Sequence, residues 1–122
     1  SPADVVLAFS TSGKTREVLE MLELARKLGV NKVVGISSVT THPDATIGQY
    51  CKTVIDMGPV QEPCHLGLTP SASSAVMLAL GDALSLVVMQ RRGFTRADYG
   101  LRHHGGYLGH KAKQTTTGDI TD

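Results

Sequence analysis

A short segment near the start of the chain constrains the fold more than any other feature. Five apolar residues, Val5–Phe9, are followed at once by a hydroxyl-rich stretch at residues 10–15. A continuous apolar run of this length, ending abruptly in a polar turn, is typical of a parallel strand that is buried on both faces. We therefore expect a buried strand whose carboxyl end opens into a polar loop.

The rest of the chain alternates between expected helices and strands. A helix is expected at residues 14–28, because apolar side chains recur there at helical spacing and Gly29 can end it. The segments expected after it are a strand at 32–37, a short helix at 43–49, a strand at 53–56, a loop at 57–70, a long helix at 71–92, a short helix at 95–101 capped by Thr95, a glycine-rich loop at 102–109 and a polar, frayed end at 113–122. This order predicts an α/β fold with a parallel sheet, in which ligands bind beyond the carboxyl ends of the strands.

Composition places the chain among globular proteins and narrows its partners. The 122 residues are 41% hydrophobic and 19% charged, with a net charge of +1, so we expect no general attraction to nucleic acid or to a membrane. Aromatic residues make up 4%, with no Trp, so a base-stacking surface is not expected. The apolar stretch at 75–89 is interrupted by Gly81 and Asp82, which favours a buried helix over a membrane span. Cys51 and Cys64 are too few for a disulfide-built secreted domain, which favours reduced thiols and a cytoplasmic protein.

The loop at residues 10–15 has the composition of a phosphate-binding site. The start of a helix exposes unpaired N–H groups and partial positive charge, which suit a phosphate when hydroxyl donors lie beside them. The candidate phosphate-binding residues are Ser10, Thr11, Ser12, Gly13, Lys14 and Thr15. Gly13 is expected to let the backbone approach the ligand closely, so this hypothesis requires the Gly13 amide to be open.

Two other interpretations of this loop stay open at the level of sequence. The hydroxyls could simply cap the following helix, although one hydroxyl is enough for a cap. Gly13, Lys14 and Thr15 also match the end of a nucleotide-binding P-loop, with Asp56 as the acid that would help to hold Mg²⁺. The first glycine of that motif falls on Ala8, however, and without it the loop cannot wrap around phosphates in the same way.

A family resemblance rests on three segments. They are Ser-Thr-Ser-Gly-Lys-Thr at 10–15, the loop at 62–74 that begins Glu-Pro-Cys-His-Leu-Gly-Leu, and the run from Gly-Asp-Ala-Leu at 81–84 through Arg-Arg-Gly-Phe-Thr at 91–95 to the glycine-rich stretch at 103–109. With these segments the chain resembles the sugar isomerase (SIS) domain, in its arabinose 5-phosphate isomerase branch. The likeness extends to about residue 111.

The resemblance implies a three-layer αβα parallel sheet, the flavodoxin-like SIS fold, at residues 1–111, followed by a polar tail at 112–122. It implies phosphosugar binding and aldose–ketose isomerisation, with interconversion of D-arabinose 5-phosphate and D-ribulose 5-phosphate as the expected reaction. No cofactor and no metal are implied, and the implied assembly is a homodimer or homotetramer. The implied site residues are Glu62 and His103 as catalytic groups, Glu17 as a weaker supporting acid, and Thr69, Ser71 and Ser73 as further substrate-binding residues.

Each catalytic candidate has an ordinary structural explanation as well. A glutamate in a loop, such as Glu62, is usually a solvated surface group, and as a base it would need a pKa that burial raises. His103 could cap a helix or bond a carbonyl group. The histidines at 103, 104 and 110, taken with Cys64, fit no standard zinc spacing.

Several departures from the family's pattern bear on activity. Lys14 stands where the family usually has Glu, and His104 replaces its usual Pro. The family's leading helical segment and first strand, with a Gly-x-Gly-Lys-Ser-like loop, have no counterpart in this chain, nor does the regulatory CBS pair. We therefore expect the chain to be part of a larger domain and to hold an incomplete active site. The alternative to an isomerase is a non-catalytic phosphosugar-binding module that acts as a sensor or assembly unit.

Overall fold

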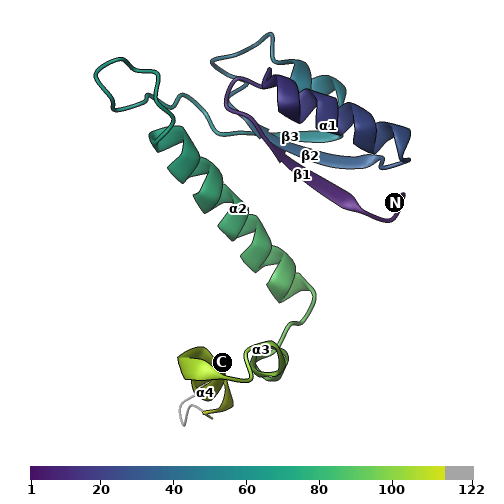
Figure 1. Ribbon diagram of the computed structural model, residues 1–122, viewed down its shortest axis with the longest axis vertical. Helices are drawn as coiled ribbons and strands as arrows, with labels where there is room; N and C mark the ends of the chain where they lie inside the picture. Colours follow the sequence, from purple (N-terminus) through teal and green to yellow (C-terminus); the bar gives the residue numbers. More distant parts are fainter. Residues whose placement is uncertain (115–122) are drawn as a thin grey trace. The chain divides into compact units, whose positions relative to one another are not determined.

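The computed structural model describes residues 1–114, and the chain divides into two compact units, Ser1–Gly81 and a second that begins at Asp82. Figure 1 shows the course of the chain along its elements. Their bounds are β1 Val5–Phe9, α1 Arg16–Lys27, β2 Lys32–Ser37, the 3-10 helix η1 Thr46–Gln49, β3 Thr53–Asp56, α2 Ala72–Arg91, α3 Arg96–Arg102 and α4 Gly106–Lys113.

The three strands form one parallel sheet in the order β1-β2-β3. In this register Ala8 lies beside Gly35, and Gly35 lies beside Val54. The predicted parallel α/β class is confirmed, and the three predicted strands match the observed bounds. Their carboxyl ends share one edge of the sheet, so the loops that follow them start close together.

The core of the first unit lies between the sheet and α1. Ala8 from β1, Val33 from β2, Leu22 from α1 and Ile47 from η1 form one buried cluster. In Figure 1, α1 runs along the sheet, as this packing requires. On β1 alternate side chains face away from the cluster, and among them Val5 is 64% exposed.

The long helix α2 corrects an expectation. The sequence predicts a buried helix, but in the described part of the chain only 6% of its most apolar 18-residue window is buried. By length and composition alone α2 is apolar enough to cross a membrane. Its apolar residues surround the whole circumference of the helix, so no single face directs it against the sheet. The hydrophobicity of α2 predicts burial, but most of the helix stays exposed in the described chain, with Leu78 70% exposed.

The second unit holds α3, α4 and a second correction. The predicted Thr95 cap is confirmed: Thr95 and Asp98 form a reciprocal capping box at the start of α3. The segment predicted as a glycine-rich loop at 102–109 instead turns helical at Gly106. Gly109 is needed inside α4 because a Cβ there would lie 1.7 Å from the His103 carbonyl oxygen. The glycines that indicated a loop therefore permit close backbone packing.

The expected boundary between domain and tail stays a prediction. Helix α4 continues to Lys113, two residues past the boundary expected after residue 111. The rest of the expected polar tail, residues 115–122, lies outside the described residues.

Candidate functional site

Backbone hydrogen bonds join the loops after β1 and β2 at the carboxyl edge of the sheet. The Ser38 N–H donates to the Thr11 carbonyl at 3.0 Å, and the Ile47 N–H donates to the Gly13 carbonyl at 2.9 Å. The Ser37 hydroxyl donates to the same Thr11 carbonyl at 3.2 Å. The loop at residues 10–15 is thus held in place by residues about 26 to 34 positions further along the chain.

The 10–15 loop is closed by its own hydrogen bonds, which corrects the role expected for Gly13. The Gly13 amide donates to the Ser10 carbonyl at 3.1 Å, so this amide is not open to a ligand. Gly13 has φ +65°, and a Cβ on it would lie 2.6 Å from the Ala45 Cβ. The glycine therefore permits a left-handed turn and close packing against the protein's own chain, rather than approach of a ligand.

Hydroxyl bonding in this loop also bears on the capping interpretation. The Ser10 and Thr15 hydroxyl oxygens lie 2.8 Å apart and share a hydrogen bond. Thr15 occupies the N-cap position of α1, yet its side chain makes no capping hydrogen bond. The first turn of α1 is left without a side-chain cap, so its N–H groups are free to meet an acceptor.

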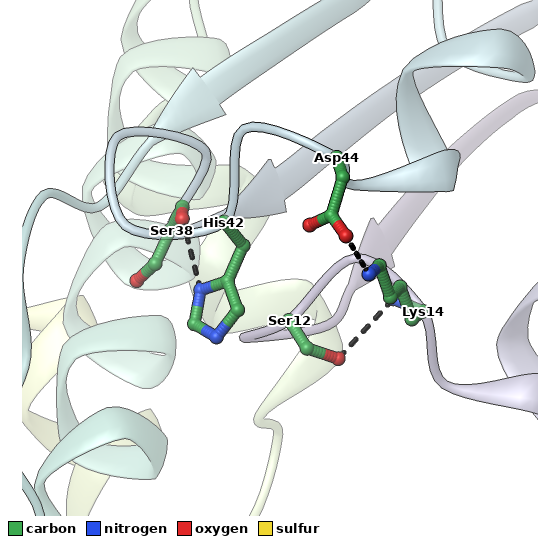
Figure 2. A network of polar contacts seen from close by, with 5 residues as sticks. All are labelled: Ser12, Lys14, Ser38, His42 and Asp44. Atoms are coloured by element: carbon green, nitrogen blue, oxygen red, sulfur yellow. Dashed lines mark hydrogen bonds and ion pairs between the residues drawn. The ribbon is translucent and has the colours of Figure 1, made fainter.

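Two charged side chains link the loops at this edge. Figure 2 shows Ser12 and Lys14 on the loop after β1, and His42 and Asp44 on the loop after β2. The Lys14 ammonium donates to the Asp44 carboxylate, and this contact is the main reason that the Asp44 pKa is lowered. His42 Nδ1 lies 3.2 Å from the Ser38 carbonyl oxygen, at hydrogen-bonding distance.

A cavity of about 750 Å³ lies beside this edge. Residues from the loops after all three strands line it: Thr11 follows β1, His42 follows β2, and the segment 60–70 follows β3. The full lining is Thr11, His42, Val60, Gln61, Glu62, Cys64, His65, Leu66, Gly67, Leu68, Pro70 and Ser73. The structure therefore brings three of the predicted site residues, Thr11, Glu62 and Ser73, to one cavity.

Glu62 is held by the start of α2, and its pKa moves opposite to the expected direction. One carboxylate oxygen accepts the Ser71 N–H and the Ala72 N–H, each at 2.9 Å, and the Ser71 hydroxyl at 3.1 Å. A hydrogen bond from the Ser73 side chain is the largest cause of a lowered pKa of Glu62, and the Ser71 donors add to it. The raised pKa that would make Glu62 a stronger base is not found, because the donors at the helix start stabilise the charged form.

The remaining candidates in this loop serve Glu62 or the chain itself. Ser71 directs its hydroxyl to Glu62 and to the Thr69 carbonyl, and the buried Ser73 lies against the same carboxylate. The Thr69 N–H donates to Cys64 Sγ at 3.3 Å. These contacts make Ser71 and Ser73 positioning groups for Glu62 in this structure.

Among the cavity residues that sequence reasoning did not single out as site residues, three have titratable side chains: His42, Cys64 and His65. The Cys64 sulfur accepts the Leu68 and Thr69 N–H groups at 3.4 and 3.3 Å. These donors, with Thr69 first, lower the pKa of the Cys64 thiol to about 6. The available signal was position, since each of these residues follows a predicted strand at the edge where ligands bind.

Two predicted catalytic residues lie on other elements of the chain, Glu17 on α1 and His103 directly after α3. Glu17 is exposed in the first turn of α1. His103 belongs to the second unit, where its ring stacks on Tyr99 with centroids 4.1 Å apart and its Nδ1 lies 3.2 Å from the Tyr99 carbonyl oxygen. Among residues 1–114, no group of three or more His, Cys, Asp or Glu side chains is arranged to hold a metal ion.

The parallel sheet and the cavity at its carboxyl edge define the class of protein, an α/β domain with its candidate site built from the loops after the strands. The SIS domain family model matches residues 1–87. The chain belongs to the SIS domain family, which confirms the resemblance carried by its three sequence segments.

Relatives and solved structures agree with this assignment. The chain is 39% identical over 108 residues to an arabinose 5-phosphate isomerase, KdsD, of Pseudomonas aeruginosa, covering 88% of this chain and 32% of that protein. It is 36% identical over 111 residues to the KdsD of Yersinia pestis, covering 91% of this chain and 33% of that protein. The chain therefore spans about a third of the length of these relatives.

Two solved structures share the fold. An Escherichia coli protein in complex with arabinose 5-phosphate matches with a TM-score of 0.71 and 35% identity, over 82% of this chain and 51% of that one. A Bacteroides fragilis protein described as a phosphosugar isomerase involved in capsule formation matches with a TM-score of 0.75 and 40% identity, over 85% of this chain and 53% of that one.

Proposed function

We propose that the protein to which this chain belongs is a sugar-phosphate isomerase that interconverts D-arabinose 5-phosphate and D-ribulose 5-phosphate. The observation that carries the proposal is the cavity at the carboxyl edge of the sheet, where Glu62 lines the same space as Thr11 of the hydroxyl-rich loop. The relatives named arabinose 5-phosphate isomerase give the substrate class.

The phosphate is proposed to bind at residues 10–15 and the first turn of α1. The Gly13 amide is engaged within the loop, so the hypothesis in the form that required this amide to be open is wrong. The donors in the revised proposal are the hydroxyls of Thr11, Ser12 and Thr15 and the uncapped N–H groups of α1. Ser10 is buried and already bonded to Thr15, so it would shape the loop, whereas Thr11 faces the cavity. Lys14 supplies the positive charge at this position.

Isomerisation then needs a base that carries a proton between two neighbouring carbons. Glu62 is ionised at neutral pH because its pKa is lowered, so it can take a proton from C1 or C2 of the open-chain sugar, although it is a weaker base than a carboxylate whose pKa burial raises. The electron pair of the broken C–H bond moves into an enediol, and the same carboxyl returns the proton to the other carbon. His103 is proposed as the acid that serves the carbonyl oxygen, within the complete protein.

The test of this role is Glu62→Gln in the full-length protein. The amide oxygen can still accept the Ser71 and Ala72 N–H groups, so the start of α2 keeps its acceptor while the base is lost. We expect isomerisation to fall by about 10² to 10⁴-fold, the usual contribution of a positioned acid–base group. Glu20→Gln on α1 removes an exposed carboxylate of the same charge as a control. An unchanged rate in Glu62→Gln would refute the assignment.

A second candidate function is a phosphosugar-binding module without catalysis. The observation that favours it is the engagement of Lys14 with Asp44, at a position where the family usually carries a glutamate. Detectable conversion of ribulose 5-phosphate to arabinose 5-phosphate by the full-length protein would reject this candidate, and binding of the same sugar without conversion would support it.

We further propose that the complete protein is a cytoplasmic homodimer or homotetramer. Both cysteines of the chain are free thiols, as suits a reducing compartment. The exposed apolar helix α2 supports self-association, because a helix that is apolar all round is stable in water only when other surfaces cover it.

A further inference from the structure

The ion pair between Lys14 and Asp44 links the loops after β1 and β2 next to the proposed phosphate site. Its two side chains are 45% and 71% exposed, so the pair is not part of the core. The Lys14 N–H donates to the Ser12 hydroxyl at 3.2 Å, which places this lysine inside the hydroxyl-rich loop. An exposed ion pair of this kind adds little to stability.

The backbone fixes Asp44 beside the loop. Its neighbour Ala45 packs so closely on Gly13 that a Cβ there would lie 2.6 Å from the Ala45 Cβ. The Ala45 N–H donates to the His42 carbonyl at 3.0 Å, and the Ile47 N–H donates to the Gly13 carbonyl at 2.9 Å. These contacts hold the backbone of Asp44 beside the loop, within reach of the Lys14 ammonium.

We propose that the Asp44 carboxylate competes with the phosphate for the Lys14 ammonium. The ion pair between Lys14 and Asp44 must break before that ammonium can bind the ligand. This inference rests on the proposed function, because it concerns the same phosphate site. A carboxylate and a phosphate dianion repel each other, and one exposed ammonium cannot bond both at full strength. Asp44 thus lowers the affinity for the phosphosugar and favours its release.

The experiment measures arabinose 5-phosphate and inorganic phosphate binding to the full-length protein by calorimetry at low salt. Asp44→Asn is expected to tighten both affinities by about threefold to fivefold, the range of one exposed ion pair. The gain shrinks at high salt because the charges are screened. Asp44→Glu keeps the competing charge and is expected to bind as the wild type does. Asp4→Asn changes the net charge equally at an exposed position before β1, at the end of that strand opposite the 10–15 loop, and is expected to leave both affinities unchanged.

A double-mutant cycle separates competition from simple repulsion. If Asp44 holds Lys14 away from the ligand, Lys14→Met costs more affinity in the Asp44→Asn background than in the wild type. Equal losses in the two backgrounds, or no gain from Asp44→Asn, would overturn the inference while leaving the proposed function intact. A wild-type protein that binds neither ligand would overturn both.

Discussion

Ser37 and Ser38 stand next to each other after the same strand, yet their hydroxyls have opposite surroundings. Both residues are buried, at 0% and 1% exposure. The Ser37 hydroxyl donates to the Thr11 carbonyl at 3.2 Å, whereas the Ser38 hydroxyl has no hydrogen-bond partner within residues 1–114. A buried polar group without a partner carries its desolvation cost uncompensated.

This contrast predicts opposite effects of removing each hydroxyl. Ser37→Ala should lower the free energy of unfolding by about 1 kcal/mol, because it removes a buried hydrogen bond and leaves the Thr11 carbonyl with one partner fewer. Ser38→Ala should leave stability unchanged or raise it by up to about 1 kcal/mol, because nothing is lost that was bonded. Urea unfolding of the two full-length variants checks this, and equal losses would contradict it.

The two cysteines should differ in reactivity. Donors from the 68–69 backbone bring the pKa of Cys64 to about 6, whereas burial raises the pKa of Cys51 above its ordinary value. Since the thiolate is the nucleophile, Cys64 should be alkylated by iodoacetamide with a half-maximal rate near pH 6, and Cys51 only in alkaline solution. Mass spectrometry of Cys51→Ser and Cys64→Ser variants follows each thiol separately. A common alkaline midpoint for both thiols would refute this.

At the scale of elements, the loop between β1 and α1 is stabilised by its fit against the segment before η1. Gly13 takes part in this fit through its positive φ and through the Ala45 Cβ that occupies its open side. Gly58 also has a positive φ, of 71°, but nothing lies within 4 Å of the position its Cβ would take. Substitutions at these two glycines therefore distinguish the cost of a strained backbone, which both share, from the cost of a steric clash, which only Gly13 has.

Gly13→Ala should destabilise the protein more than Gly58→Ala. The left-handed conformation lowers the free energy of unfolding of both variants by about 1–2 kcal/mol. Overpacking against Ala45 lowers that of Gly13→Ala by about a further 1–3 kcal/mol. Thermal unfolding of the two full-length variants measures the difference. If the two variants unfolded alike, the close packing of Ala45 on Gly13 would not exist in solution.

For the whole molecule, the exposed surface of α2 is the main feature that the described fold leaves unsatisfied. Leu78 and Leu86 on this helix are 70% and 60% exposed. Exposed apolar surface on this scale marks an interaction site. If a second copy of the protein covered α2, its exposed apolar side chains would be buried, as the hydrophobicity of the helix predicts.

A charge on α2 should therefore break the assembly of the full-length protein. Leu78→Glu is expected to weaken self-association on the order of a hundredfold, because a carboxylate would be buried without a partner. Leu24→Glu, on α1 at 57% exposure, is the matched control and should assemble normally. Light scattering at micromolar concentration gives the mass of each, and a monomeric wild type would count against the prediction.

Local sequence was sufficient for the elements that one stretch of chain defines alone. Apolar runs bounded by polar turns predicted β1, β2 and β3 with their observed ends. Thr95 predicted the start of α3, because its capping partner Asp98 lies only three residues further along the chain. The order of these elements was enough to predict a parallel sheet and to direct attention to its carboxyl edge. Each of these features follows from periodicity or from contacts between near neighbours, which the sequence displays directly.

Long-range packing determined the rest. The Gly13 turn fits because Ala45 packs on it and the Ile47 N–H donates to its carbonyl. Glu62 is a weaker base because donors at the start of α2 stabilise its charged form. Helix α4 can start at Gly106 because Gly109 has no Cβ to collide with the His103 carbonyl. In each case the contacting residue lies several to many positions away in sequence. The sequence could therefore identify the chemical group but could not predict its hydrogen-bond partners. A pKa and an open amide depend on which atoms are near, and only the folded chain brings those atoms together.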